Sequence, residues 1–570
     1  MAMHIDIVPN RKSKPAILLR ESFRVGKKVR KRTLANLSTL PLDQVDAIRR
    51  ILKGEKLEAI TDLFRVKRSR LHGHVNAVEE TMRRLGLARI LASRKSKERS
   101  IVLAMIATQV IEPDSKLGMT RWWHTTTIPE IFGVEDADAD DLYGAMDWLL
   151  RRQSRIEKKL AAKHLEEGSL VLYDLTSSYF EGKTCLLAKL GHNRDGKKGK
   201  LQVNYGLLTD RRGCPVAVSV YEGNTGDAAT LQDQVEKVRN EFGIKRMVLV
   251  GDRGMISQKQ IDGLKDEKGV DWITALRTDA IRNLVEGGAL QLDLFDEKNL
   301  FEFAHPDYPG ERLVACRNPE MMKRRRHKRQ ALLDATMDEL DKINRMVANG
   351  RLAGQDKIGV RVGRVVNKYK VAKHFNLNIN KKSFSYSLDQ EKIDREAALD
   401  GIYVVRTSLS KRAMKASDAV LSYKKLSEAE RAFRSLKSID LMVRPIRHRM
   451  VDRVQAHIFF CMLTYYVQWH MKEAWRPLMF SDEDLDAKAE RDPILPAKRS
   501  RSAMKKVNTK KLEGGETVHS FRTLLKDLSS IVRNTCRREE AKDSESSFSI
   551  DTTPSQSQQK ALDLIAQISM

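Results

Sequence analysis

The chain has 570 residues, with 104 Lys and Arg against 76 Asp and Glu, so its formal net charge is +28. Hydrophobic residues make up 41% of the chain, which excludes a wholly disordered basic protein and allows about three or four domains. The excess of cations argues against an ordinary metabolic enzyme and favours a polyanionic partner, of which nucleic acid is the commonest. Charge alone leaves anionic membranes and acidic proteins open as alternatives.

The sequence contains no predicted membrane span or secretory signal. Residues 1–15 have no apolar core, and the most apolar runs, Ile101–Ile111 and Ile458–Val467, are shorter than the roughly 20 residues that cross a bilayer. The five cysteines form no CxxC pair and no Cys/His cluster along the sequence. We therefore expect reduced thiols, no structural zinc and a cytoplasmic location.

The N-terminal part of the sequence predicts two regions. Within residues 1–60, the β-prone runs Ile17–Phe23 and Lys28–Leu37 flank Gly26 and predict a basic β-hairpin arm. Residues 61–165 show helical periodicity in their apolar positions and predict a helical domain.

From about residue 168, short apolar strands alternate with helices. The order is three strands, helix, strand, helix, strand, which predicts an α/β fold with a mixed sheet. The expected strands are Ser169–Leu175, Val203–Thr209, Pro215–Tyr221, Arg246–Val250 and Trp272–Leu276, and the expected helices are Thr230–Phe242 and Gln258–Asp266.

Residues 277–418 interrupt the α/β pattern. They contain the β-like pieces Val360–Val366 and Gly401–Thr407 and a long basic helix, Pro319–Val347. Strong helical periodicity returns in Ala419–Met471. Residues 277–418 therefore predict an inserted subdomain inside the α/β core.

The last part of the sequence is polar and basic, with cations concentrated in Lys498–Lys511. One further helix is expected at His519–Arg533. Asp543–Gln559 is rich in Ser, Thr and Gln, and we expect it to be disordered because it has few apolar residues to bury.

Three carboxylates are candidates for a metal site. Asp174 lies in an apolar strand, Asp252 ends another strand, and Glu430 lies on a helix. Carboxylates supply the oxygen ligands that Mg²⁺ and Mn²⁺ prefer, and a charge inside a strand is costly unless it is paired or binds a metal. The alternatives are turn or cap roles for the aspartates, and for Glu430 a capping box with Ser427 or an ion pair with Arg434.

The predicted helix around Glu430 has two distinct faces. At about 100° per residue, its apolar positions fall on one face and a polar stripe runs along the flank. The stripe would place an acid beside an aromatic hydroxyl and two cations, as a metal and phosphate site requires. The apolar face comprises Leu426, Ala429, Phe433 and Leu436, and the stripe comprises Tyr423, Glu430, Arg434 and Lys437.

Six sequence elements in order resemble those of bacterial insertion-sequence transposases of the DDE type. The resemblance runs from about residue 165 to 475, and each element alone is weak. The elements are VLYDLTSSYFEG around Asp174, GHNRDGKKGKLQVNYGLL (191–208), YEGNTGD (221–227), VLVGDRGMIS around Asp252, DGIYVVRTS (400–408) and YKKLSEAERAFRSLKSIDLMVRPIRHR (423–449).

The resemblance implies an RNase H-like catalytic core, a mixed sheet flanked by helices, formed by residues 166–276 and 419–478. It implies that residues 277–418 are an inserted β-rich and helical subdomain. It makes the hairpin arm (1–60) and the helical domain (61–165) the N-terminal DNA-binding region, with 61–165 binding the transposon ends. Residues 479–570 remain a basic, partly disordered C-terminal tail.

The resemblance also implies an activity. Asp174, Asp252 and Glu430 would hold two Mg²⁺ or Mn²⁺ ions, cleave DNA at the terminal inverted repeats, and join the freed 3′-OH to target DNA by transesterification. The partners would be transposon-end and target DNA, with a homodimer in the synaptic complex and a nucleoid-associated location in the bacterial cytoplasm. A decayed or domesticated DNA-binding relative, or a metal-dependent nuclease without strand transfer, are the competing interpretations.

One position departs from the family's third-acid signature, Y-x2-R-x3-E-x6-K. Tyr423, Glu430 and Lys437 match it, but Leu426 stands where Arg is usual. We expect Arg434 or Lys424 to supply the missing cation.

The expected DNA contacts fall into three groups. The first surrounds the acids, the second follows the catalytic helix and matches the family's RPI-H element, and the third lies on the inserted basic helix, where a solvated helix face is the alternative. They are Arg253, Tyr423, Arg434 and Lys437; then Arg444, Arg447 and His448; then Lys323, Arg324, Arg325 and Arg326.

Overall fold

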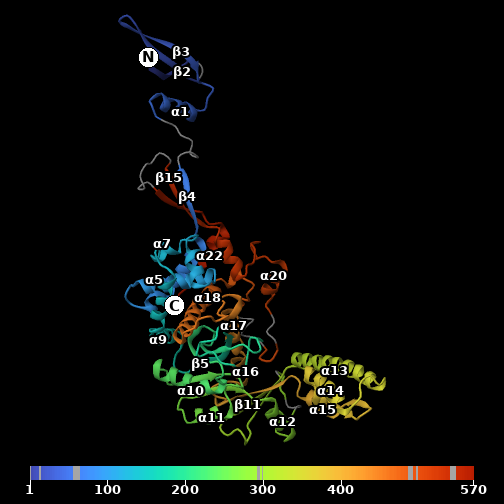
Figure 1. Cartoon of the computed structure of the whole chain (residues 1–570). Helices are drawn as coiled ribbons and strands as arrows, with labels where there is room; N and C mark the ends of the chain where they lie inside the picture. Colours follow the sequence, from blue (N-terminus) through green and yellow to red (C-terminus); the bar gives the residue numbers. More distant parts are fainter. Residues whose placement is uncertain are drawn as a thin grey trace. The chain divides into compact units, whose positions relative to one another are not determined.

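Figure 1 shows a computed structural model of the chain, which describes residues 2–11, 14–55, 64–291, 295–297, 299–484, 492–495, 499–538 and 547–569. The chain divides into two compact units. One comprises residues 1–70 and 532–552, and the other comprises residues 71–531 and 553–570. Each unit is therefore built from segments that are far apart in the sequence.

The smaller unit contains two antiparallel sheets and one helix. Its first sheet has the strand order β1-β2-β3, in which β2 and β3 form a hairpin whose turn contains Gly26 at a φ of 61°. Its second sheet has the order β16-β15-β4 and joins the two sequence segments. The elements are β1 (Ala2–Val8), β2 (Ala16–Val25), β3 (Lys28–Asn36), α1 (Leu42–Leu52), β4 (Phe64–Leu71), β15 (Val532–Arg538) and β16 (Ser547–Asp551).

The larger unit begins with a helical layer. These helices pack around the long helix α18 (Val451–Ala474), which contacts α3, α5, α8 and strand β7 and is buried over most of its length. The helices are α3 (Gly73–Arg84), α4 (Leu87–Leu91), α5 (Lys97–Ile111), α6 (Lys116–Trp123), α7 (Ile128–Phe132), α8 (Ala139–Leu150) and α9 (Gln153–His164).

A mixed sheet of eight strands forms the centre of the larger unit, in the order β10-β11-β14-β9-β8-β5-β6-β7. Strand β8 is parallel to both β5 and β9, and the other neighbours are antiparallel. The strands are β5 (Ser169–Tyr179), β6 (Gln202–Thr209), β7 (Pro215–Glu222), β8 (Met247–Val250), β9 (Val270–Ala275), β10 (Leu300–Phe303), β11 (Arg312–Arg317) and β14 (Ile402–Thr407). The α/β fold class expected from the sequence is confirmed.

Short helices connect and cover these strands. After β7 the chain forms α10 (Leu231–Glu236), which continues as a π-helical turn over Lys237–Glu241. The other short helices of the larger unit are α11 (Gln258–Lys265), α12 (Thr278–Glu286), α16 (Ala416–Lys424), α17 (Leu426–Arg434), α20 (Arg501–Thr509) and α21 (Phe521–Leu528).

Residues 277–418 contribute to two parts of the larger unit. Strands β10, β11 and β14 extend the central sheet, whereas residues 319–398 have an apolar core of their own. Figure 1 shows α13, α14 and α15 grouped together. The elements of this subdomain are α13 (Pro319–Ala348), α14 (Gln355–Tyr369), β12 (Phe375–Ile379), β13 (Phe384–Leu388) and α15 (Gln390–Ala398).

The β-like piece expected at Val360–Val366 is wrong, because these residues belong to helix α14. Ile358, Val362 and Val365 are buried in the subdomain core, and their spacing follows the helical period and not the alternation of a strand. β-branched composition suggested a strand, but the burial pattern decides for a helix.

The disorder expected over Asp543–Gln559 is wrong for the described residues 547–559, which include β16 and the start of α22 (Gln556–Ala566); residues 543–546 lie outside the described part. Ser555 caps α22 with a capping box, and Ala561 and Ile565 are buried in the main core. The indole Nε1 of Trp475 donates to the carbonyl of Ala561 at 2.9 Å. A few apolar residues at helical spacing therefore anchor a polar segment.

A buried ion pair joins β14 to the loop before β11. Arg406 binds both carboxylate oxygens of Glu311, whose side chain is fully buried, and the Nε–Oε2 distance is 2.6 Å. We expect Arg406→Ala to lower the free energy of unfolding by about 3–5 kcal/mol, because it leaves a buried carboxylate without its partner. Urea unfolding of the full chain measures this change.

Arg431→Ala is the matched control, because the Arg431–Glu428 pair on α17 is exposed at the arginine. Its removal should cost no more than about 1 kcal/mol. Equal losses in the two variants would contradict the structural role of the Arg406–Glu311 pair.

Candidate active site

The register of two parallel strands places Asp174 and Asp252 side by side. Strand β8 pairs with β5 from Ser169↔Met247 to Leu172↔Val250. Asp174 lies two residues beyond the last pair on β5, and Asp252 lies two residues beyond it on the chain leaving β8. Paired strands lie about 4.8 Å apart and side chains alternate between faces. Both aspartates therefore belong to the same face of the sheet, just beyond the carboxyl end of the paired segments.

Alternation along β5 also determines which helices meet Asp174. Tyr173 points to one face, where its hydroxyl donates to Thr230 Oγ1 at 2.9 Å. Leu172 points to the other face and shares an apolar cluster with Val250 and Leu426. Asp174 has the same parity as Leu172, so it lies on the face covered by α16 and α17.

Helix α17 brings Glu430 to this face. It packs directly against β5, with Leu426 and Ala429 buried and Glu430 exposed. The capping box considered for Ser427 and Glu430 does not form, because α17 begins at Leu426 with Lys425 as its N-cap and no side-chain cap. Within the described residues, no ion pair joins Glu430 to Arg434. Glu430 is therefore free of both structural roles that the sequence left open.

Asp252 and Glu430 are close enough for their charges to shift the pKa of Asp174. Burial raises the pKa of Asp174 to about 7, and the negative charges of Asp252 and Glu430 add to the rise. The backbone N–H of Leu175 donates to Asp174 at 2.8 Å and, with the charge of Arg194, opposes it. The site is a carboxylate cluster that lacks enough positive charge of its own.

Tyr423 lies at the same cluster. Burial raises the pKa of its hydroxyl to about 12, and the charges of Asp252, Glu430 and Asp174 contribute to the rise, while Arg253 opposes it. The aromatic hydroxyl and the Arg253 guanidinium are thus close to the acids, as the sequence stripe predicted for Tyr423.

A tight turn holds Asp252 in place. Its Oδ1 accepts hydrogen bonds from the backbone N–H groups of Gly254 at 2.9 Å and Met255 at 2.8 Å. One carboxylate oxygen is therefore engaged by the turn, and the side chain remains exposed at the edge of the sheet.

Asp195 is a buried anchor that the sequence analysis did not single out. Its Oδ1 lies 3.0 Å from Lys437 Nζ and 2.5 Å from Arg444 Nη1, and its Oδ2 accepts from the backbone N–H of Tyr179 at 3.0 Å. Asp195 belongs to the quoted element 191–208, so the motif contained the signal although no role was assigned to the residue. It ties two of the expected DNA contacts to strand β5.

Arg194, the neighbour of Asp195, links two of the quoted elements. Its guanidinium lies 2.5 Å from Asp227 at the end of the element 221–227. Asn204 of β6 donates to the carbonyl of Thr225 at 2.9 Å in the same element. Sequence elements that are separated along the chain therefore meet beside Asp174.

The other expected contacts near the acids differ in exposure. Arg434 is exposed at the end of α17, and Arg447 is exposed with a 3.4 Å contact to Glu181. His448 is half-buried against the rings of Tyr143 and His457, and burial lowers its pKa to about 4. Without DNA, the His448 imidazole is therefore neutral at neutral pH.

Lys424 is not available as the missing cation of the third-acid signature. Its Nζ donates to the backbone carbonyls of Ile494 at 2.8 Å and Leu495 at 3.3 Å. Of the two substitutes for the usual Arg, the exposed Arg434 is the one that the geometry leaves open.

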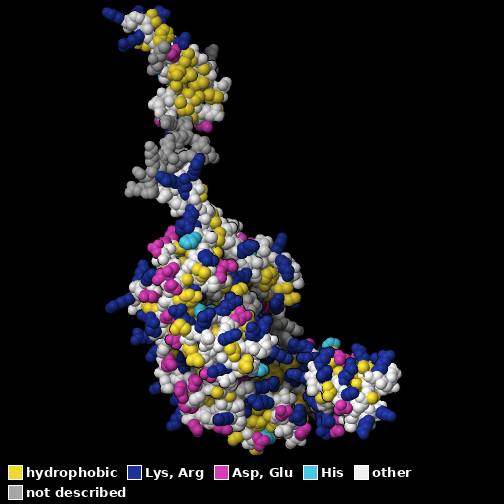
Figure 2. Space-filling model, in the orientation of Figure 1, with side chains coloured by type: hydrophobic (Ala, Val, Ile, Leu, Met, Phe, Trp, Pro, Cys, Tyr) yellow, Lys and Arg dark blue, Asp and Glu magenta, His cyan; other side chains and the backbone are white. Residues whose placement is uncertain are grey.

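The basic run on α13 is exposed, including Lys323, Arg324, Arg325 and Arg326. Arg329, one turn further on, is instead buried in an ion pair with Asp400. Figure 2 shows Lys and Arg side chains exposed over the subdomain that contains α13.

The residues of the acidic cluster fit a divalent metal. All three donors are carboxylates, the hard oxygen ligands that Mg²⁺ and Mn²⁺ prefer. Burial and the neighbouring charges of Asp252 and Glu430 raise the pKa of Asp174, so a bound cation would favour its ionised form. Among the described residues, the three acids are not a group whose ligand atoms all lie within 4.8 Å of one another. At least one pair of their carboxylates is therefore further apart than this.

The family comparison decides the class. The family model described as "Transposase DDE domain" matches residues 167–467, which is more than half of the chain. The chain belongs to the DDE transposases. A second model, "IS1634 family transposase, N-terminal domain", matches residues 5–61.

Solved structures similar to this chain include a transposase complex. No curated protein sequence matches the chain. A structure titled "Cryo-EM structure of piggyBac transposase synaptic complex with hairpin DNA" is similar to this chain with a TM-score of 0.35 and 10% identity, over 80% of this chain and 76% of that chain.

The protein is therefore a DNA transposase of an insertion sequence, an enzyme that cleaves DNA and transfers strands. DDE domains generally use divalent metal ions, and DNA is the partner. Among the described residues, no helix is long and apolar enough to cross a membrane.

Asp174→Asn should stabilise the metal-free protein. The folded-state pKa of about 7 lies above the ordinary value of 3.8, so the native state holds a proton that the unfolded chain has lost, and stability falls as the pH rises through this window. At about 1.4 kcal/mol per pKa unit, the variant should gain a few kcal/mol at pH 8 and much less at pH 4.

Urea unfolding in the presence of a chelator at the two pH values measures this gain. The exposed Asp262→Asn on α11 is the matched control and should show no such pH-dependent gain. A variant Asp174→Asn that is less stable than the wild type at pH 8 would contradict the proposed electrostatics.

Proposed function

We propose that Asp174, Asp252 and Glu430 hold two Mg²⁺ or Mn²⁺ ions and are the catalytic residues of this transposase. The observation that carries the proposal is the parallel register of β5 and β8, which puts the two aspartates on one face, with α17 packed across it. When bound, the ions would lower the pKa of a water or a 3′-OH and stabilise the leaving oxygen of a phosphodiester.

The chain's own residues would fix the carboxylates in place and contact the phosphate. The turn after β8 fixes one oxygen of Asp252, and the N–H of Leu175 fixes one oxygen of Asp174, so both carboxylates are held before DNA arrives. Tyr423 and Arg253 stand beside the acids, where a phosphate oxygen would need donors.

We assign Asp195 a positioning role within the same reaction. It holds Lys437 and Arg444 at fixed places and neutralises part of their charge, while their remaining N–H donors can bind the DNA backbone. Arg434 and Arg447 would extend this basic edge, and residues 1–60 and 61–165 would read the terminal inverted repeats. A homodimer would hold the paired ends in the cytoplasm.

A strand-joining assay tests the proposed triad. It uses pre-cut transposon-end DNA, Mg²⁺ and a supercoiled target, with Asp252→Asn and Glu430→Gln as variants. Each substitution removes a metal-binding charge, so we expect joining to fall at least about 100-fold while end binding stays within about twofold.

Glu428→Gln, two positions before Glu430 on α17, is the control and should join DNA at the wild-type rate. Near-normal joining by Asp252→Asn would contradict the triad. Nicking of the supercoiled target without joining by the wild type would indicate a nuclease, and binding without either reaction would indicate a decayed relative.

The basic run on α13 should contribute salt-dependent affinity without sequence choice. Replacing Lys323, Arg324, Arg325 and Arg326 by Ala should weaken binding to unrelated and terminal DNA alike, because phosphate contacts carry no base information. The slope of log K against log [salt] should become less negative by about 0.9 for each phosphate that the variant no longer neutralises.

The same titration with Arg361→Ala/Arg364→Ala on α14 provides a control for net charge on that subdomain. An unchanged slope in the α13 variant would show that this run is only a solvated helix face.

A further inference from the structure

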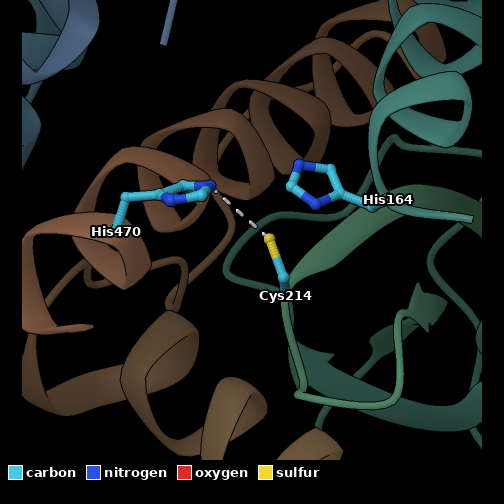
Figure 3. Close-up of side chains that lie close together, drawn as sticks. All are labelled: His164, Cys214 and His470. Atoms are coloured by element: carbon cyan, nitrogen blue, oxygen red, sulfur yellow. Dashed lines mark hydrogen bonds between the residues drawn. The ribbon is translucent and has the colours of Figure 1, made fainter. Parts of the chain in front are cut away.

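Three side chains with potential metal-ligating atoms, none of them a member of the acidic triad, converge in the larger unit. Figure 3 shows His164, Cys214 and His470 pointing toward one another. His164 ends helix α9, Cys214 immediately precedes strand β7, and His470 lies near the end of α18. One ligand atom of each lies within 4.8 Å of the others, and these three are the group of this kind found among the described residues.

We propose that His164, Cys214 and His470 bind one Zn²⁺ ion. The three donors are two imidazoles and a thiol, the set that a borderline-soft divalent ion selects over Mg²⁺. The ion would join the helical layer to the edge of the central sheet, because α9, the residue before β7 and α18 each supply one ligand.

The distances suit a tetrahedral ion. Cys214 Sγ lies 3.8 Å from His470 Nε2. An ion about 2.3 Å from sulfur and about 2.0 Å from nitrogen would hold these two atoms about 3.5 Å apart at the tetrahedral angle. The pair therefore needs to close by only a few tenths of an ångström.

The surroundings orient His164 for ligation. Its Nε2 is 3.0 Å from the hydroxyl of Tyr466, and its Nδ1 is 3.3 Å from Arg212. A metal on Nδ1 would leave Nε2–H to donate to Tyr466, as histidine ligands commonly donate through their second nitrogen. Arg212 would keep its other partner, Asp210, at 2.9 Å.

Burial favours the ligating form of both histidines. It lowers the pKa of His164 to about 4 and of His470 to about 3, so both imidazoles are neutral and keep a lone pair at neutral pH. The Cys214 thiol, buried and with a raised pKa, would lose its proton to solvent when the Zn–S bond forms.

An adjoining cavity supplies the fourth position. It has a volume of about 660 Å³ and is lined by His164, His470, Arg212 and Glu473, among others. A water from this cavity would complete a tetrahedral site that three protein ligands leave open.

Cobalt substitution of the full-length protein tests the proposal. The chelator-treated chain is titrated with Co²⁺ in the presence of excess Mg²⁺, and the sulfur-to-cobalt charge-transfer band is recorded in the near ultraviolet. We expect a band that saturates at one Co²⁺ per chain, is displaced by Zn²⁺, and is lost in Cys214→Ser and in His470→Ala.

Cys461→Ser is the stringent control, because Cys461 is also buried and lies 3.9 Å from one ring nitrogen of His457. It should retain the band. The acidic triad cannot produce the band, because it contains no sulfur. Absence of the band in the wild-type chain, or its loss in Cys461→Ser with retention in Cys214→Ser, would overturn the proposal without bearing on the proposed triad.

Discussion

The parallel pairing of β5 with β8 is the constraint on which the candidate active site depends. Asp252 follows Asp174 by 78 residues (252 − 174), and the two strands pair at the same offset. A shift of one residue would turn one aspartate to the opposite face. The same alternation fixes the face on which α17 must pack to present Glu430, so one register positions all three acids.

The sequence predicted the parts of the site that depend on local pattern. Composition and spacing could predict the central strands, Asp174 in one of them and Asp252 just after another. They could also predict Glu430 outside the apolar face of its helix. The family resemblance supplied their joint role, which no spacing between distant residues could show. The resemblance also showed that Leu426 departs from the family's third-acid signature, and the burial of Leu426 in an apolar cluster gives that departure a physical reason.

The features that the sequence did not predict depend mainly on contacts between distant segments of the chain. Asp195 contacts Arg444 and also Lys437, which is 242 residues away in the sequence. Only the folded chain shows that one carboxylate binds both cations. Helix α14 and the ordered α22 were missed because β-branched and polar compositions outweighed a helical spacing of few apolar residues. The expectation of no structural zinc rested on sequence spacing, which cannot show that His164, Cys214 and His470 lie close together in the fold.

The net charge of +28 and the proposed acidic triad would act in opposite ways on DNA. The cations would hold DNA, whereas the triad would repel it until metal neutralises the carboxylates.

Anomalous diffraction from Mn²⁺-soaked crystals with pre-cut end DNA is the most direct test of the proposed metal site. We expect two Mn²⁺ peaks about 4 Å apart in contact with Asp174, Asp252 and Glu430. Ordered DNA at this face with no anomalous peak at these carboxylates would contradict it.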